Sequence, residues 1–405
     1  MYSKFSTFLF VGLALLFWQS GSLKAQDKIW TGAVDSSWHT SGNWNPSGVP
    51  SASQTVSMRG NVTPYPVITS NVTVRSVTVN QWYSSPGDQL TIRNNATLTI
   101  TDDFTMSGAG ILNIVNGHVI MTATTSGANN FAVNSANSVV NITNGSFTAG
   151  TLSEDVDVEI IGSFNLGNGS LTVHGDFDIS NSDTFNAEDG TVVINGNTIV
   201  NGTYNGDDGN TTFNGSVDVK SGGVLNLGSG TITFNGETFV GNSGTANLGS
   251  GTVYINDNIE VKSGGYFNVE DANVTVTGDA DFTSNGNLTI DTGSITITGN
   301  ASLSSGGTMD LNSGSLNVGG DASFTAGGVV NAGDATITLE GDFTVSSGTN
   351  FNSDSSTVVF SGDSTQTVSS GGNVTFYNVV VDSGAVLNTD GGSGNTIVIE
   401  NTLVV

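Results

Sequence analysis

The chain has 405 residues, no cysteine, and 35 acidic against 8 basic residues, which gives a formal net charge of −27. The absence of cysteine excludes disulfide cross-links and thiol nucleophiles. After Asn95 there are 32 acidic residues and only two basic ones, Lys220 and Lys262. This balance excludes nucleic-acid and anionic-lipid binding as the function, because both rest on Lys and Arg neutralising phosphate.

The first 25 residues read as a signal peptide. Met1 to Lys4 carry one positive charge, Phe5 to Trp18 form an apolar run of fourteen residues, and a polar stretch leads to Ala25. The run is shorter than the roughly 20 apolar residues of a membrane-spanning helix, and no other segment approaches that length. We expect no transmembrane span, cleavage near Ala25, and a secreted or cell-surface mature protein that begins at Gln26.

Residues 26–95 have the composition of a capping region. All five tryptophans and all five prolines of the chain precede residue 87. We expect Trp30, Trp38 and Trp44 to plug the first end of the structure and to keep its edge from pairing with other chains. A site where these aromatic rings stack on sugars is the alternative.

Residues 96–376 form a repeat. Unit starts fall at residues 96, 117, 145, 169, 190, 209, 230, 251, 272, 293, 314, 335 and 356, and nine of the twelve spacings are 21 residues. Positions 3 and 5 of the unit are apolar in nearly every copy, and looser apolar pairs follow at positions 9 and 11 and at 17 and 19, with Gly-rich turns between them. Three short strands per unit predict an all-β, parallel, right-handed β-helix of about thirteen coils.

Position 18 supports parallel coils over hairpins. It is Asn in eleven of the thirteen units, at 113, 141, 165, 186, 205, 226, 247, 268, 331, 352 and 373, with Thr289 and Asp310 as exceptions. In stacked coils these amides would lie about 4.8 Å apart and could hydrogen-bond to one another. A single coil buries too little apolar surface to stand alone, so its neighbours must stabilise it.

The segment from Ile29 to Pro50, IWTGAVDSSWHTSGNWNPSGVP, resembles the opening of large surface proteins of Bacteroidetes, the type IX secretion cargo and related autotransporter-like β-solenoids. The stretches TVSMRGNVTPYPVITSNVTVRSVTVN and STVVFSGDSTQTVSSGGNVTFYNVVV are similar to the same group. The resemblance covers most of the chain and implies architecture and an extracellular place, not chemistry. Such proteins typically carry a C-terminal sorting domain, and none is visible in this sequence.

No catalytic constellation stands out. The three histidines, His39, His118 and His174, are scattered, and no arginine follows Arg93. Polysaccharide-eliminating β-helices need such a basic residue, and hydrolases need a carboxylate pair at a defined separation. We therefore expect neither an enzyme nor a bound cofactor.

Acidic residues raise one metal hypothesis. Position 8 is Asp at 103, 176, 279, 321, 342 and 363, which turn geometry after Gly explains, with a calcium role as the alternative. The coils that begin at 117 and 145 are seven and three residues longer than usual, so loops are expected there. Glu154, Asp155, Asp157 and Glu159 cluster in this part of the chain and are the best candidates for a calcium or partner contact.

The outward side of the first strand is rich in hydroxyl groups. Position 2 is Thr, Ser or Asn in twelve of thirteen coils, and position 4 is Thr in eight. A solvated sheet is the plain interpretation, and binding of glycan or ice is the alternative. The candidate residues of this ladder are Thr231, Thr233, Thr275, Thr296, Thr336 and Thr338.

Residues 377–405 read as a last coil without a cap. Thr396 to Glu400 alternate like a strand, and the segment that follows has no Pro, charge run or aromatic plug. We expect either that the chain continues or that this edge docks on another molecule, including end-to-end self-association. The whole sequence predicts an extracellular or cell-surface structural stalk or adhesin segment without catalysis, whose partners are extracellular glycans or another surface protein. The alternative is a glycan-binding or polysaccharide-processing β-helix.

Overall fold

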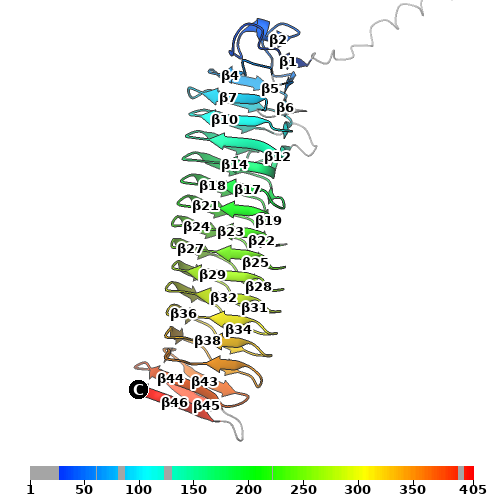
Figure 1. Ribbon diagram of the computed structural model, residues 1–405. Helices are drawn as coiled ribbons and strands as arrows, with labels where there is room; N and C mark the ends of the chain where they lie inside the picture. Colours follow the sequence, from blue (N-terminus) through cyan, green and yellow to red (C-terminus); the bar gives the residue numbers. More distant parts are fainter. Residues whose placement is uncertain (1–26, 61, 81–86, 123–129, 221, 391–395) are drawn as a thin grey trace, which may run out of the picture.

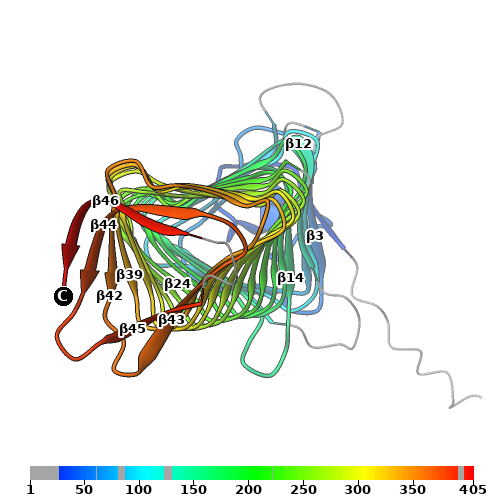
Figure 2. The same cartoon turned by 90° about the horizontal axis from the view of Figure 1, so that it is seen from below.

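The computed structural model describes residues 27–60, 62–80, 87–122, 130–220, 222–390 and 396–405. They form one rod of stacked parallel β-coils, blue at its N-terminal end and red at its C-terminal end (Figure 1). Seen from below, the coils superimpose around one shared interior (Figure 2). The predicted signal peptide lies outside the described residues. The prediction of an all-β parallel solenoid with a period of about 21 residues is confirmed.

The first side of the rod is a 16-stranded parallel sheet, which we call the first sheet. Its strands are β5 (Val72–Val74), β8 (Thr97–Ile100), β11 (His118–Met121), β13 (Ser146–Ala149), β15 (Ser170–Val173), β18 (Thr191–Ile194), β21 (Asn210–Phe213), β24 (Thr231–Phe234), β27 (Thr252–Ile255), β30 (Asn273–Val276), β33 (Ser294–Ile297), β36 (Ser315–Val318), β39 (Thr336–Leu339), β42 (Thr357–Phe360), β44 (Val374–Val381) and β46 (Ile397–Val404).

The other two sides are two stacks of strands that β12 (Asn130–Ile142) and β14 (Asp157–Asn165) join into one 30-stranded sheet. Besides parts of these two strands, the second stack contains β1 (Lys28–Trp30), β3 (Thr55–Arg59), β6 (Ser76–Asn80), β9 (Phe104–Ser107), β16 (Phe177–Ile179), β19 (Thr198–Val200), β22 (Val217–Val219), β25 (Thr238–Val240), β28 (Ile259–Val261), β31 (Ala280–Phe282), β34 (Ala301–Leu303), β37 (Ala322–Phe324), β40 (Phe343–Val345), β43 (Thr365–Ser370) and β45 (Val386–Asp390).

The third stack contains β4 (Val67–Ile68), β7 (Gln89–Arg93), β10 (Ile111–Val115), β17 (Thr184–Asn186), β20 (Thr203–Asn205), β23 (Val224–Asn226), β26 (Thr245–Asn247), β29 (Tyr266–Glu270), β32 (Asn287–Ile290), β35 (Thr308–Asp310), β38 (Val329–Asn331) and β41 (Asn350–Asn352). The thirtieth strand of this sheet is β2 (Trp44–Asn45), which pairs with β1 at the N-terminal end, where the single turn of 3-10 helix η1 (Ser41–Asn43) also lies.

Alternation within each short strand builds the core. In the coil that contains β24, Ile232 and Phe234 point inward and are buried, while Thr231 and Thr233 point outward. The apolar pairs of the other two stacks, such as Val217 and Val219, are buried in the same way. Because strands of successive coils pair in parallel and in register, each inward residue stacks on its equivalent in the next coil.

The predicted number of coils was too low. The solenoid has about 16 turns, to judge from the strands of its first sheet, against the thirteen that the repeat suggested. The additional first-sheet strands lie at both ends: β5 falls within residues 26–95, together with β3, β6 and β7 of the other stacks, and β44 and β46 follow β42 of the last repeat. The early strands alternate apolar and polar residues but lack the Gly, Thr and Asn signature by which the repeat was counted.

The tryptophan cap is confirmed. Trp30, Trp38 and Trp44 are at most 2% exposed, and their rings meet edge to face at centroid distances of 5.0 Å for Trp30 and Trp44 and 4.7 Å for Trp38 and Trp44. β1 pairs antiparallel with β2 and parallel with β3, so this cluster covers the N-terminal end of the stack. Rings this deeply buried present no face on which a sugar could stack.

The position-18 asparagines form a continuous hydrogen-bonded ladder on the outer side of the third stack. From Asn141 to Asn268, each Nδ2 donates to the Oδ1 of the equivalent residue one coil earlier, with Asn113 as the first acceptor, over 2.7–3.1 Å. The side chains are half-buried. A second run joins Asp310, Asn331 and Asn352.

Asn373 was wrongly assigned to this ladder. It lies in an exposed turn, where its Oδ1 accepts a hydrogen bond from the backbone N–H of Thr396. Phe343 pairs with Val368, 25 residues later, so four extra residues shift the count in this coil. The same shift removes Asp363 from the position-8 series, because Thr367 takes its place and donates to Asp342 Oδ1.

Many residues at position 8 form a second kind of ladder. The side-chain Oδ1 of one residue accepts a hydrogen bond from the backbone N–H of its equivalent in the next coil, as Asp321 does from Asp342 and Asn300 does from Asp321, both at 2.8 Å. Two runs of such bonds exist, from Asp157 to Ser216 and from Asn258 to Thr367. Asp and Asn in these two runs therefore act as hydrogen-bond acceptors between coils.

Replacing Asn247 by Leu should remove two rungs of the asparagine ladder, one to Asn226 and one from Asn268. We expect the free energy of unfolding to fall by about 1–2 kcal/mol, since each neighbour loses a partner in a half-buried position. Asn256→Leu is the control, because Asn256 is exposed and makes one such bond, to Asn235. Equal denaturation midpoints for wild type and Asn247→Leu would contradict a stabilising role of the ladder.

Candidate functional site

The outer side of the first sheet from β8 to β42, which we call the hydroxyl face, carries two rows of outward side chains. None of these thirteen strands contains Asp, Glu, Lys or Arg. The six threonines predicted from the sequence all lie in the two rows, where Thr231 and Thr336 are exposed and the other four are half-buried. An uncharged face on a chain with 35 acidic residues is the most marked asymmetry of this surface.

The rows form a regular grid. Neighbouring coils place equivalent residues about 4.8 Å apart, and the two rows on one strand are roughly 6.7 Å apart. The pairing Thr231↔Thr252 and Thr275↔Thr296 keeps hydroxyl groups adjacent along the rod. The position-4 row departs from Thr at Ile120, Val193, Tyr254, Asn317 and Val359.

Tyr254 is the residue on this face that the sequence reasoning missed. Its side chain is 43% exposed, and in the position-4 row it lies between Thr233 and Thr275 of the adjacent coils. The signal was available in the sequence, because Tyr254 is the one aromatic residue at an outward position of the thirteen repeats' first strands.

The four calcium candidates do not form a metal-binding group. Glu154 and Asp155 lie in an exposed turn, and Asp157 and Glu159 project outward from β14. Across the described ranges, no cluster of three or more His, Asp or Glu side chains could hold a metal ion. Part of the long loop predicted in the coil of residue 117 falls in residues 123–129, outside the described residues, and a register shift between Asn134 and Val139 takes up more of its extra length.

Asp157 and Glu159 instead contribute to an acidic strip with Asp176 and Asp178 of the next coil. Glu159 pairs in register with Asp178, and Asp157 Oδ1 accepts the N–H of Asp176 at 2.8 Å. Burial raises the pKa of Asp178, and the negative charges of Asp176, Glu159 and Asp157 raise it further, whereas Lys220 lowers it. Within the described residues, Asp178 Oδ1 is buried without a hydrogen-bond partner.

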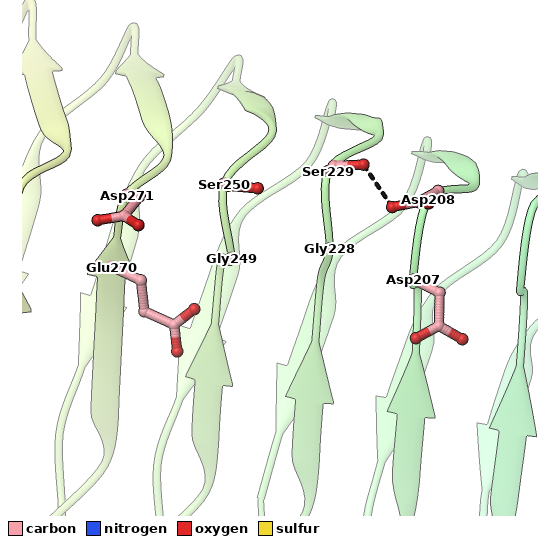
Figure 3. Close-up of a pocket in the computed structure, with 8 residues that line it drawn as sticks. All are labelled: Asp207, Asp208, Gly228, Ser229, Gly249, Ser250, Glu270 and Asp271. Carbon is pink, nitrogen blue, oxygen red and sulfur yellow. Dashed lines mark hydrogen bonds between the residues drawn. The ribbon is translucent and has the colours of Figure 1, made fainter.

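A shallow groove of about 490 Å³ crosses four coils at one corner of the rod, between β20 and β29. Asp207 and Asp208 lie at one end, Glu270 and Asp271 lie at the other, and small residues form the floor between them (Figure 3). Ser229 Oγ donates a hydrogen bond to Asp208 Oδ1. The floor residues are Gly228, Ser229, Gly249 and Ser250.

Coil stacking accounts for this groove. A Cβ on Gly228 would overlap the backbone carbonyl of Asp207, and Gly249 has a φ of +69° that side chains rarely adopt. The two acidic ends are three coils, or about 14 Å, apart. Glycosidases need their carboxyl groups at about 5–9.5 Å, so the two ends cannot act as such a pair.

The two lysines after Arg93 and the three histidines each have local partners. Lys220 Nζ lies 3.0 Å from Asp218 Oδ2, and Lys262 Nζ lies 2.7 Å from Glu260 Oε2 and 5.3 Å from the ring centroid of Phe239. Each histidine bonds a polar side chain elsewhere on the rod: His39 to Ser70, His118 to Ser146 and His174 to Asn195. None of these lysines and histidines lines the acidic groove.

Replacing Asp178 by Asn should stabilise the protein at neutral pH. A raised pKa means that the folded state binds the proton of Asp178 more tightly than the unfolded chain does. Protonation of Asp178 therefore stabilises the wild-type fold below the unfolded pKa of about 3.9, and this stabilisation is lost as the pH rises through the folded pKa. We expect Asp178→Asn to melt at a higher temperature than wild type at pH 7, with the difference vanishing near pH 3.

Asp281→Asn is the matched control, because Asp281 continues the same outward row on β31 but is exposed. Thermal melts of both variants across this pH range provide the measurement. A lower melting temperature of Asp178→Asn at pH 7 would mean that the Asp178 charge is stabilising and that the electrostatic account is wrong.

Comparison with known proteins identifies one domain. A family model described as a domain of unknown function, DUF8693, matches residues 29–148, which include the tryptophan cap and the first coils. No curated protein and no solved structure matches the chain. No helix in the ranges that the structure describes is long and apolar enough to cross a membrane. The chain is therefore a β-solenoid protein with a DUF8693 domain at residues 29–148.

Proposed function

We propose that this protein is an extracellular or cell-surface structural element, a stalk or adhesin segment without catalysis. The observation that carries the proposal is the continuous stacking of about 16 coils, which makes a rod roughly 75 Å long from coils spaced about 4.8 Å apart. Each coil contacts only its neighbours, so length can be set by the number of repeats. A rod of this kind separates what is attached to its two ends.

The surface ladders support a stiff spacer. The asparagine ladder and the position-8 ladder tie successive coils together outside the core, in addition to the backbone pairing of the three stacks. Glycines occupy the corners, as at Gly228 and Gly249, because the backbone of the preceding coil lies too close to leave room for a side chain. A rod held in this way bends little, because tilting one coil against the next at one corner would break hydrogen bonds between the two coils on the other sides.

The proposed extracellular place rests on the sequence. Residues 1–25 have the charge, apolar run and small-residue end of a signal peptide. The segment Ile29–Pro50 is similar to the opening of Bacteroidetes surface β-solenoids, which supports export in that manner. Secretion also suits an acidic chain without cysteine that relies on packing alone.

The proposed absence of catalysis rests on the surface. The two lysines after Arg93 are held by Asp218 and Glu260, and the acidic ends of the groove are too far apart to act as a pair. A polymer bound to such a surface would meet no acid, base and charge clamp in one place.

Expression of residues 1–405 in a Gram-negative host tests the function proposal. We expect an exported product with Gln26 as its first residue and no release of reducing ends or unsaturated products from pectin, alginate or xylan. Leu15→Arg, which places a charge in the apolar run, should retain the chain in the cytoplasm. Cytoplasmic wild-type protein would overturn the export proposal, and product above a heat-killed control would overturn the proposal of inertness.

We propose end-to-end self-association through β46 as a property of the rod. β46 is the terminal strand of the first sheet and pairs only with β44 among the described strands. Leu403 and Val404 on it are 55% and 50% exposed, and Val386 on the neighbouring strand β45 is 57% exposed. An apolar edge with free backbone groups favours pairing with another chain.

Light scattering on residues 26–405 tests this association. We expect the apparent mass to rise with concentration, and Val404→Lys to suppress the rise by placing a charge on the edge. Val34→Lys is the control, because Val34 is equally exposed, at 64%, but lies at the opposite end of the rod. A wild-type mass that stays monomeric at high concentration would contradict the proposal.

A further inference from the structure

Tyr254 differs from every other residue at its position on the hydroxyl face. The inner side of β27 is filled by Val253 and Ile255, both fully buried, so the outward Tyr254 ring adds nothing to the core. The equivalent residues one coil away on either side are the threonines Thr233 and Thr275. A Thr at residue 254 would serve the strand equally well, yet the chain places a half-exposed ring there.

The surroundings of Tyr254 combine an apolar ring with fixed hydroxyl groups. Thr233 and Thr275 lie about 4.8 Å to each side in the same row, and Thr252 lies about 6.7 Å away on the same strand. The backbone of all three belongs to paired strands in the middle of the rod. Binding would therefore require little ordering of the protein, and Tyr adds a large rigid contact area at low conformational cost.

The charge distribution selects the class of ligand. The strands of the hydroxyl face from β8 to β42 contain no Asp, Glu, Lys or Arg, whereas acidic residues gather at its borders, with Asp257 after β27 and Glu270 and Asp271 before β30. These charges would repel polyanions such as uronates and phosphates, and the strands of the site, β24, β27 and β30, carry no Lys or Arg to compensate. A neutral ligand rich in hydroxyl groups fits both the face and its borders.

We propose that Tyr254, with Thr233, Thr252 and Thr275, forms a binding site for a neutral glycan. The C–H face of a pyranose ring stacks on the Tyr254 ring, and the threonine hydroxyls exchange hydrogen bonds with the hydroxyl groups of the same or adjacent sugars. The two rows continue along the rod, so a polymer can follow the face beyond the central site. This site is independent of the spacer role, since a rod is equally stiff with or without it.

The ring also argues against two other occupants. A flat ice lattice or a second hydroxyl face would have to meet both rows at once, and the larger, 43% exposed Tyr254 side chain interrupts the threonine row between Thr233 and Thr275. A polymer of separate rings can place one ring on the tyrosine and its neighbours over the threonines. This interruption of the row therefore favours a glycan over a continuous flat surface.

The test uses residues 26–405 and four neutral probes: cellohexaose, mannohexaose and xylohexaose in solution, measured by calorimetry, and microcrystalline cellulose in pull-down. We expect at least one probe to bind and polygalacturonate, the charged control, not to bind. Tyr254→Thr should weaken binding at least about tenfold and Tyr254→Phe far less, because the ring is kept. Thr233→Val and Thr275→Val should each weaken binding by a few fold, since each removes one hydroxyl at nearly constant shape.

Tyr266→Thr is the matched control. Tyr266 lies in the same coil and is 47% exposed, but it belongs to the third stack on another side of the rod. Binding by none of the neutral probes, equal loss in Tyr254→Thr and Tyr266→Thr, or a preference for polygalacturonate would overturn the proposal. So would ice-growth inhibition or self-association that depends on Tyr254 while no glycan binds. Circular dichroism melts of Tyr254→Thr keep a folding defect from being mistaken for a lost contact.

Discussion

Parallel backbone pairing between successive coils is the constraint on which the rest of this structure depends. A coil of 21 residues buries too little apolar surface alone, so each must give its strands to both neighbours, and every residue must then repeat in register. The corners follow from this demand. Residue 228 must be glycine, because the backbone carbonyl of Asp207 occupies the space that a Cβ would need. The groove beside Gly228 is therefore a consequence of coil stacking.

The repeat made most of the architecture predictable, and its irregular units set the limit. The period and the asparagines at position 18 were sufficient to predict parallel stacking, because only that geometry brings Asn226, Asn247 and Asn268 together. Counting by position failed at Asn373, where four extra residues precede Val368. It also missed the coils of β3, β6 and β7, whose strands alternate without the repeat's turn residues.

Side-chain roles were less predictable than positions. The acidic residues at position 8 looked like turn formers, but their acceptor bonds to the next coil depend on where the backbone N–H of Asp342 or Asn300 points, which no pattern in one unit reveals. The acidic candidates near Glu154 were adjacent in sequence and yet lie on different elements, a turn and a strand. Tyr254 was visible in the sequence as a departure from Thr. Recognising it as a candidate binding residue required the structure, which places it in the middle of the uncharged hydroxyl face.

The asparagine ladder gives the rod a direction. Every amide from Asn141 to Asn268 donates toward the N-terminal end and accepts from the C-terminal side, and the shorter run that ends at Asn352 has the same sense. Aligned amide dipoles polarise one another and sum along their axis, as peptide dipoles do in a helix. The N-terminal end of the ladder thus carries partial positive charge and its C-terminal end partial negative charge. Two rods that pair through β46 bring like poles into contact, so the electrical polarity of the rod acts against the attraction between the two apolar edges and weakens their tail-to-tail association.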